Sequence, residues 1–156
     1  MTDYGTLMLA ELARAPHTPT SASDLATRTG IGAATVSKLL KSLARADLVT
    51  SHRGSQGGYC LARPAQDISA VSIIDAIEGP VALTACASDD AQCDLEAVCG
   101  VGSAWQQISA SIRDGLDAIS LDDMRRNHKL PQTIPLRPMF GARKSLSRQP
   151  AMQRDQ

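Results

Sequence analysis

The apolar positions in the first third of the chain recur at helical spacing and predict three helices. The first covers residues 4–15 and ends before Pro16. The second is short, is capped by Ser21 and stops at Gly30, and the third covers residues 33–46. The residues predicted to face inward are Tyr4, Leu7, Met8, Leu12 and Ala15 in the first helix, and Val36, Leu39, Leu40 and Leu43 in the third.

A hairpin is predicted directly after the third helix. Residues 48–50 and 59–61 have the character of strands, and the segment H-R-G-S-Q-G-G connects them. Two helices joined by a glycine-containing turn and followed by such a hairpin are the pattern of a winged helix-turn-helix. The tip carries Arg53, which a DNA minor groove attracts through its negative potential. We see little packing purpose for the glycines around Arg53, and this favours a binding role for the tip.

The second half of the chain predicts two more helices separated by a loop. Ser69 caps the first, with Val71, Ile74 and Ile77 inward and a stop at Gly79. Residues 81–102 show no sustained period and are expected to form a loop. A long helix then opens at Ser103. Its apolar stripe could pack on the N-terminal domain or on the same helix of a second copy, and consists of Trp105, Ile108, Ile112, Leu116 and Ile119.

The charges divide the 156-residue chain into three regions, although 16 basic and 16 acidic residues cancel overall. Counted from the sequence, residues 1–64 carry seven basic and four acidic residues, residues 65–124 one and eleven, and residues 125–156 eight and one. The net charges are therefore +3, −10 and +7. We expect a DNA-binding domain, a sensor region with a dimerisation helix, and a basic disordered tail, in that order.

A membrane partner and export are not expected. The longest apolar runs are far shorter than the roughly 18 residues that a membrane span needs. No Lys or Arg precedes Arg14, so a secretory signal is not indicated. We therefore expect a cytoplasmic protein, in which cysteines stay reduced.

Three cysteines, Cys86, Cys93 and Cys99, form the pattern C-x6-C-x5-C in the predicted loop. These gaps are too long for a zinc knuckle or a C-x2-C redox pair. Three thiolates suit an iron–sulfur cluster, zinc or Cu(I), and would leave a position for a ligand from elsewhere. The spacing alone leaves open a cluster, an adventitious zinc site, or three unrelated loop residues. Cys60, in the second predicted strand, is interpreted as a buried structural thiol.

Candidate DNA contacts follow from the winged-helix pattern, in which the second helix of the motif enters the major groove. The outward positions there can read base edges or reach phosphates, and Ser21 can reach a phosphate. The alternative is that the lysines are simply solvated. The candidate contacts are Ser21, Ala34, Thr35, Ser37, Lys38, Lys41, Arg53, Gly54 and Gly57.

Three segments together resemble the Rrf-two family of winged-helix transcription regulators, which includes the IscR-like and NsrR-like iron–sulfur sensors. They are T-D-Y-G near the N-terminus, S-H-R-G-S-Q-G-G-Y in the hairpin, and the cysteine loop before a helix that contains Trp105. The segment C-D-L-E-A-V-C-G-V-G-S-A-W looks most like the branch that regulates the SUF cluster-assembly operon. The resemblance covers about residues 1–124.

The resemblance implies a homodimer with a long C-terminal dimerisation helix and a cluster in each cysteine loop, near the partner's N-terminal helix. It assigns Cys86, Cys93 and Cys99 as thiolate ligands. The His that some members use as fourth ligand is Gly102 here, whereas Asp3 of the partner subunit matches the Asp of NsrR-like members. Asp3 is equally compatible with a simple helix-dipole role. The resemblance favours [2Fe–2S] and leaves [4Fe–4S] open.

The resulting hypothesis is a DNA-binding repressor, not an enzyme, that senses iron–sulfur cluster, redox or nitric oxide status and controls cluster-assembly genes. Its partners would be double-stranded promoter DNA and a second copy of the chain. One alternative is a zinc-bound or nitric-oxide-responsive repressor. Another, from a different class, is an iron–sulfur or thiol redox protein without DNA binding. Against the latter, the sequence has no C-x2-C motif, no paired acid and base, and no phosphate loop.

Overall fold

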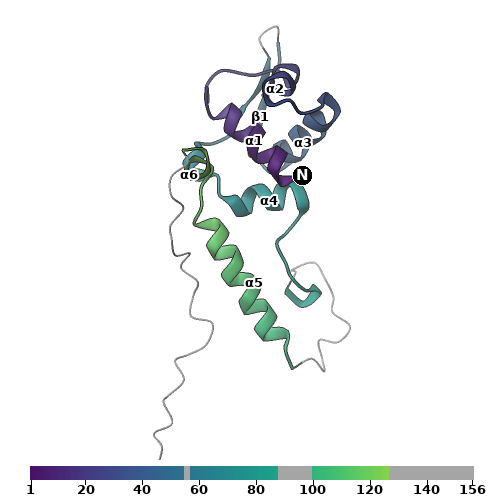
Figure 1. Ribbon diagram of the computed structural model, residues 1–156, viewed down its shortest axis with the longest axis vertical. Coiled ribbons are helices and arrows are strands. Elements are labelled where there is room, and N and C mark those ends of the chain that lie inside the picture. Colours follow the sequence, from purple (N-terminus) through teal and green to yellow (C-terminus); the bar gives the residue numbers. More distant parts are fainter. Residues whose placement is uncertain (55–56, 88–99, 127–156) are drawn as a thin grey trace, which may run out of the picture.

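The computed structural model describes residues 1–54, 57–87 and 100–126. It shows a mainly helical chain with one two-stranded hairpin, as predicted (Figure 1). Helices α1 to α4 and the hairpin form a head, from which α5 extends. The elements are α1 Thr2–Leu12, α2 Ala22–Thr29, α3 Ala33–Arg45, β1 Val49–His52, β2 Gly58–Leu61, the 3-10 helix η1 Ala65–Asp67, α4 Ala70–Glu78, the 3-10 helix η2 Ala85–Ala87, α5 Gly102–Asp117 and α6 Leu121–Arg125.

Helices α2 and α3 form the helix-turn-helix that the sequence predicts. The Ser21 hydroxyl accepts the Asp24 backbone N–H at 3.1 Å and so caps α2. The helix ends at Gly30, whose φ of +72° lies in the left-handed region that favours glycine. The predicted inward face of α3 is confirmed, because its buried residues are Val36, Leu39, Leu40 and Leu43.

The inward face of α1 differs from the prediction. The helix covers Thr2–Leu12, and Tyr4 and Leu7 are 44% and 47% exposed. Met8 and Leu12 are buried as predicted, Ala15 is exposed beyond the helix end, and the other buried positions are Gly5 and Leu9. Helix α4 packs against α1 at Gly5, where a Cβ atom would collide with the end of the Ile77 side chain. The close approach of α4 therefore selects which side of α1 faces the core.

Each strand of the hairpin is one residue longer than predicted, and an isolated bridge joins the outer edge of β2 to Thr20. Strands β1 and β2 pair antiparallel, from Val49 opposite Leu61 to His52 opposite Gly58. On the other edge of β2, Thr20 N donates to Tyr59 O at 3.0 Å and Tyr59 N donates to Thr20 O at 2.9 Å. These two hydrogen bonds fasten the wing to the segment between α1 and α2.

Helix α4 connects the head to the rest of the chain. Ser69 caps it, as predicted, and it ends at Glu78, before Gly79, whose φ is +94°. The predicted inward residue Ile74 is only half-buried, whereas Ile73 is 1% exposed. This correction has a physical reason: α4 contacts α1 and α3 on one side and α5 on another, so more than one face is covered.

Helix α6 was not predicted. It starts at Ser120, which forms a reciprocal capping box with Asp123, and its first residue Leu121 is fully buried. Leu121 N donates to Ile68 O, and Ala70 N donates to Ile119 O, both at 2.8 Å. These two hydrogen bonds hold the chain that follows α5 against the head, beside the start of α4.

Helix α5 begins at Gly102 rather than Ser103, and its predicted apolar stripe is not covered within one chain. Trp105 is 38% exposed, and Ile108, Ile112, Leu116 and Ile119 are partly buried. Ile119 was predicted on the helix, but it lies beyond the end of α5 at Asp117. The buried positions of α5 are the small residues Ser109, Ser111 and Gly115. Within the described ranges, none of the helices has both the length and the apolar character needed to cross a bilayer. The predicted basic tail lies outside the described residues from position 127 onward.

Candidate nucleic-acid interface

The outward face of α3 presents most of the residues predicted to read DNA. Ala34, Ser37, Lys38 and Lys41 are exposed, and Thr35 is half-buried. They lie on the side of α3 opposite its apolar face, which anchors the helix in the core. The amphipathic pattern of α3 therefore turns its apolar face to the core and its polar face, with the candidate DNA contacts, to solvent.

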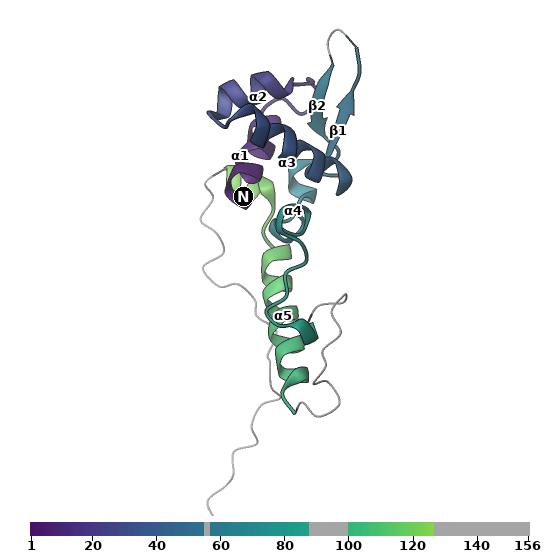
Figure 2. The same ribbon diagram turned by 90° about the vertical axis from the view of Figure 1, so that its right-hand side faces the viewer.

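The wing projects beyond the helices at the end of the head opposite α5 (Figure 2). Arg53 follows β1 directly and is exposed, and Gly54 has a φ of +121°, which explains a glycine at this position. Gly57 N donates to Gly54 O at 3.0 Å and helps to close the tip. The predicted contacts Arg53, Gly54 and Gly57 are therefore brought together, while residues 55–56 lie outside the described part.

The glycines of the wing have a structural purpose that we did not expect from the sequence. A Cβ atom on Gly57 would lie 2.6 Å from His52 O, and one on Gly58 would lie 2.6 Å from Thr20 O. Both contacts are with backbone atoms, which cannot move aside cheaply. Arg53 is consequently a candidate DNA contact because of its exposed position at the tip, and not because the glycines around it lack a packing role.

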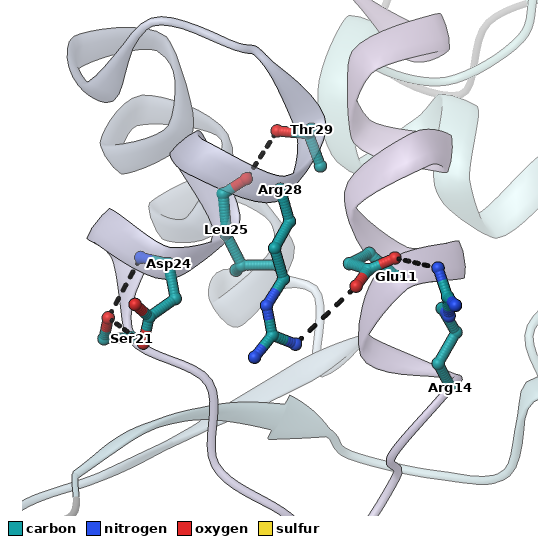
Figure 3. A network of polar contacts seen from close by, with 7 residues as sticks. All are labelled: Glu11, Arg14, Ser21, Asp24, Leu25, Arg28 and Thr29. Carbon is teal, nitrogen blue, oxygen red and sulfur yellow. Dashed lines mark hydrogen bonds and ion pairs between the residues drawn. The ribbon is translucent and has the colours of Figure 1, made fainter.

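Ser21 is used first as a helix cap. Its hydroxyl accepts the Asp24 N–H and donates to Asp24 Oδ2 at 2.7 Å (Figure 3). The same hydroxyl lies 2.9 Å from Ser23 Oγ. To donate to a phosphate, this hydroxyl would have to give up its bond to the Asp24 carboxylate. The structure thus assigns Ser21 a structural role beside the predicted phosphate contact.

Two of the seven basic residues in the DNA-binding region are held by one carboxylate. Glu11, at the end of α1, lies 3.3 Å from Arg14 Nη1 and 3.6 Å from Arg28 Nη1 (Figure 3). The Arg28 pair ties α2 to α1. The other five basic residues of residues 1–64 form no ion pair with any residue that the structure describes; they are Lys38, Lys41, Arg45, Arg53 and Arg63.

These five cations are concentrated on α3, the wing and the segment just after it. From composition alone, the net charge of +3 could be assigned only to residues 1–64 as a whole. The local sequence carried no signal for the pairing of Arg28 with Glu11, because 17 positions separate them along the chain. The tertiary arrangement therefore pairs Arg14 and Arg28 with Glu11 and leaves the cations of α3 and the wing without an ion-pair partner among the described residues.

The cysteine prediction falls mostly outside the described residues. Cys93 and Cys99 lie in the range 88–99, and of Cys86 the structure places only the backbone, in η2. Among the described residues, no three His, Cys, Asp or Glu side chains gather in a way that could hold a metal ion. Three soft thiolates still fit an iron–sulfur cluster by their chemistry, so the ligand set stays a prediction. Cys60 is 7% exposed in β2, opposite Thr50, as expected of a structural thiol.

Asp3 lies in the first turn of α1, where a carboxylate is favoured by the helix dipole. Its side chain is 72% exposed, and its Oδ1 is 3.5 Å from the Met1 amino nitrogen. A role as metal ligand for a partner subunit is not tested by these contacts and stays a prediction.

A carboxylate that the sequence did not single out, Glu78, holds the start of α1 against the end of α4. Its Oε1 lies 2.9 Å from the Met1 amino nitrogen and accepts hydrogen bonds from Thr2 N at 3.2 Å and Thr2 Oγ1 at 3.1 Å. The hydrogen bond to the amino terminus lowers the pKa of Glu78, and the same contact raises the pKa of the amino terminus. The only signal in the sequence was an acidic residue immediately before Gly79-Pro80.

Comparison with known proteins places this architecture in a family. Residues 1–127 match the Rrf2 family, described as an iron-dependent transcriptional regulator. The protein rrf2 of Nitratidesulfovibrio vulgaris (strain Hildenborough) is 33% identical over 128 residues, which cover 81% of this chain and 85% of that protein.

Two solved structures share both fold and sequence with the chain. The IscR of T. potens is 30% identical with a TM-score of 0.59, covering 85% of this chain and 88% of that one. CymR (YrzC), the global cysteine regulator of B. subtilis, is 28% identical with a TM-score of 0.61, covering 81% and 93%. The chain therefore belongs to the Rrf2, or Rrf-two, family of DNA-binding transcriptional regulators, which are not enzymes.

Proposed function

We propose that the chain is a homodimeric repressor of promoter DNA whose affinity responds to an iron–sulfur cluster, and that it controls cluster-assembly genes. The observation that carries the DNA-binding part is the set of cations on α3 and the wing that form no ion pair with the described residues. Support for the cluster comes from the C-x6-C-x5-C thiolates, the iron-dependent description of the family and the similarity to an IscR. A cytoplasmic location, where thiols stay reduced, belongs to the same proposal.

Within the DNA interface, the side chains differ in what they can recognise. Ser37 and Lys38 lie near the start of α3 and would meet base edges in the major groove. Lys41, one turn further along α3, and Ser21 would meet phosphates, which position the head without reading sequence. Arg53 would enter the minor groove beside the narrow tip that Gly54 and Gly57 allow.

A second copy of the chain would cover the apolar stripe of α5. That stripe, from Trp105 to Ile119, is exposed or half-buried in one chain, and α5 extends away from the head (Figure 2). Burying the stripe against the same helix of another copy would stabilise the dimer by about 25 cal/mol for each Å² of apolar surface removed from water. The dimer would then carry two heads for two half-sites.

The residues that would hold the cluster are Cys86, Cys93 and Cys99, with Asp3 of the partner subunit as the candidate fourth ligand. We propose [2Fe–2S], with [4Fe–4S] as the alternative. When bound, the cluster supplies a group whose charge and occupancy change with iron supply, oxidation or nitric oxide. The chain itself keeps the three thiolates in one segment between α4 and α5. Helix α4 belongs to the head, and α5 carries the apolar stripe that would form the dimer.

The same three thiolates support a second candidate, a zinc-bound or nitric-oxide-responsive repressor, because zinc also takes thiolate ligands. An iron–sulfur or thiol redox protein without DNA binding is disfavoured by the membership in a family of transcriptional regulators.

The experiment is an absorbance spectrum with iron and sulfide analysis on protein purified without oxygen, followed by DNA titration of the loaded and cluster-free forms. Visible bands with matching iron and sulfide, together with a difference in DNA affinity, are expected. A colourless zinc protein would favour the second candidate. The Asp3→Ala protein serves as a comparison, since only a ligand role changes its spectrum.

A further inference from the structure

Asp75 joins three segments of the chain through a single carboxylate. It lies on α4, and its two oxygens receive both terminal nitrogens of Arg113 on α5, with Nη1–Oδ1 at 3.1 Å and Nη2–Oδ2 at 2.7 Å. Oδ1 also accepts the backbone N–H of Val81 at 3.1 Å. A two-pronged contact of this kind fixes orientation as well as distance.

The Val81 contact matters because of where this residue lies. Val81 is five residues before Cys86, at the start of the segment that runs from α4 to η2. Further along this segment, Leu83 N lies 3.5 Å from the hydroxyl oxygen of Ser109, which is 3% exposed on α5. The segment leading to Cys86 is thereby attached to α4 through Asp75 and to α5 through Ser109.

The other end of this connection is the recognition helix. Helix α4 contacts α3 directly, and its residue Ile73 is 1% exposed in the same apolar core as Leu39 and Leu40 of α3. Ile77, two residues after Asp75, packs against Gly5 of α1, where an added Cβ would force the end of the Ile77 side chain to move. Because α4 shares a close-packed core with α1 and α3, we expect a displacement of α4 to change its contacts with α3.

We propose that Asp75 is a positioning residue that couples the cysteine segment, the chain between α4 and α5, to the recognition helix α3. It would do so by binding the backbone of Val81 and the side chain of Arg113 to α4. The proposal rests on the proposed function, because it needs a DNA affinity that depends on the state of the cysteine segment. Among the described residues, the hydrogen-bond partners of Asp75 are Val81 and Arg113, and Asp75 would act through α4.

The contact itself is tested in the cluster-free full-length protein by amide hydrogen exchange of Val81, measured by NMR. In Asp75→Ala we expect exchange at Val81 to be about tenfold faster, which corresponds to about 1.4 kcal/mol. Asp75→Asn keeps an acceptor but loses the charge, so its exchange should fall between the two. Asp117→Ala is the matched control, since Asp117 is exposed on α5 and forms no ion pair with the described residues. Equal exchange in wild type and Asp75→Ala would overturn the proposal.

The coupling is tested by the ratio of DNA dissociation constants between loaded and cluster-free protein, under nitrogen and at fixed salt. In Asp75→Ala this ratio should approach one while iron and sulfide content stay at the wild-type level. A purely structural role would change both affinities by the same factor and leave the ratio at its wild-type value, which would overturn the proposal.

The two proposals fail in different ways. If wild-type protein binds no cluster or shows a ratio of one, the proposed function fails and the coupling role falls with it. If wild-type protein responds to the cluster and Asp75→Ala responds equally, the proposed function stands and only the role of Asp75 is overturned.

Discussion

Substituting Gly58 by alanine tests how the wing is attached to the head. The backbone of Gly58 is not in the left-handed region, so alanine is compatible with its φ. The added methyl carbon, however, would lie 2.6 Å from Thr20 O, 2.7 Å from Thr20 C and 2.9 Å from Thr20 N. All three are backbone atoms of Thr20, which forms the isolated bridge with Tyr59, so the wing must move away from Thr20.

The cost follows from the hydrogen bonds that this movement breaks. Thr20 and Tyr59 exchange two, at 3.0 and 2.9 Å, each contributing about 0.5–1.5 kcal/mol. We therefore expect Gly58→Ala to lower the free energy of unfolding by about 1–3 kcal/mol. At roughly 4 °C per kcal/mol, this lowers the Tm by about 4–12 °C.

The assay is thermal unfolding followed by circular dichroism, with Gly102→Ala as the matched control. A methyl carbon added at Gly102 would have no neighbour within 4 Å among the described residues, and Gly102 lies in the first turn of α5, so the substitution should leave the Tm unchanged or raise it. DNA titration of Gly58→Ala below its Tm should show weaker binding, because the wing tip is displaced. A Tm of Gly58→Ala within 1 °C of the wild-type Tm would refute the steric reasoning, because 1 °C corresponds to a loss of only about 0.25 kcal/mol.

Four further outcomes are expected. Arg53→Ala should weaken DNA binding by about 1–3 kcal/mol at fixed salt, and by more than Arg45→Ala, which removes an equal charge from the last turn of α3, far from the helix start that would meet the bases; equal losses would contradict the wing contact. Leu40→Ala, at 1% exposure, should lower the free energy of unfolding by about 2–5 kcal/mol in urea titrations. Removing residues 127–156, with six basic residues and one acidic one, should make the salt dependence of DNA binding shallower, and an unchanged slope would exclude a role for the tail. In protein that starts at Met1, the ion pair between the amino terminus and Glu78 should contribute its full stabilisation between pH 4.5 and 8.0. This contribution should be lost as the pH falls through the lowered pKa of Glu78 and as the pH rises through the raised pKa of the amino terminus. Measurements of Tm against pH should show both losses, and Glu78→Gln should remove the loss at acid pH.

The candidate DNA interface could be predicted largely from local sequence, and the packing around it could not. The outward residues of α3 followed from its helical period, because the spacing of Val36, Leu39, Leu40 and Leu43 leaves only one face for solvent. The role of Gly58 was missed, since the backbone that it approaches belongs to Thr20, far away along the chain. The cysteine ligands stay a prediction from spacing and family resemblance.

Short-range physics made three features readable from the linear pattern: the helix-turn-helix, the hairpin, and the caps at Ser21 and Ser69. Periodicity, capping and turn chemistry each act within a few residues, so neighbouring positions contain them. Which side of α1 is buried depends instead on long-range packing, because Gly5 admits Ile77 of a helix some 70 positions later. The same holds for the neutralisation of Arg28 by Glu11 and for the link that Asp75 makes between α4, α5 and the path to the cysteines. Such contacts depend on where separate elements meet in space, and amphipathic patterns specify that a face is buried without specifying its partner.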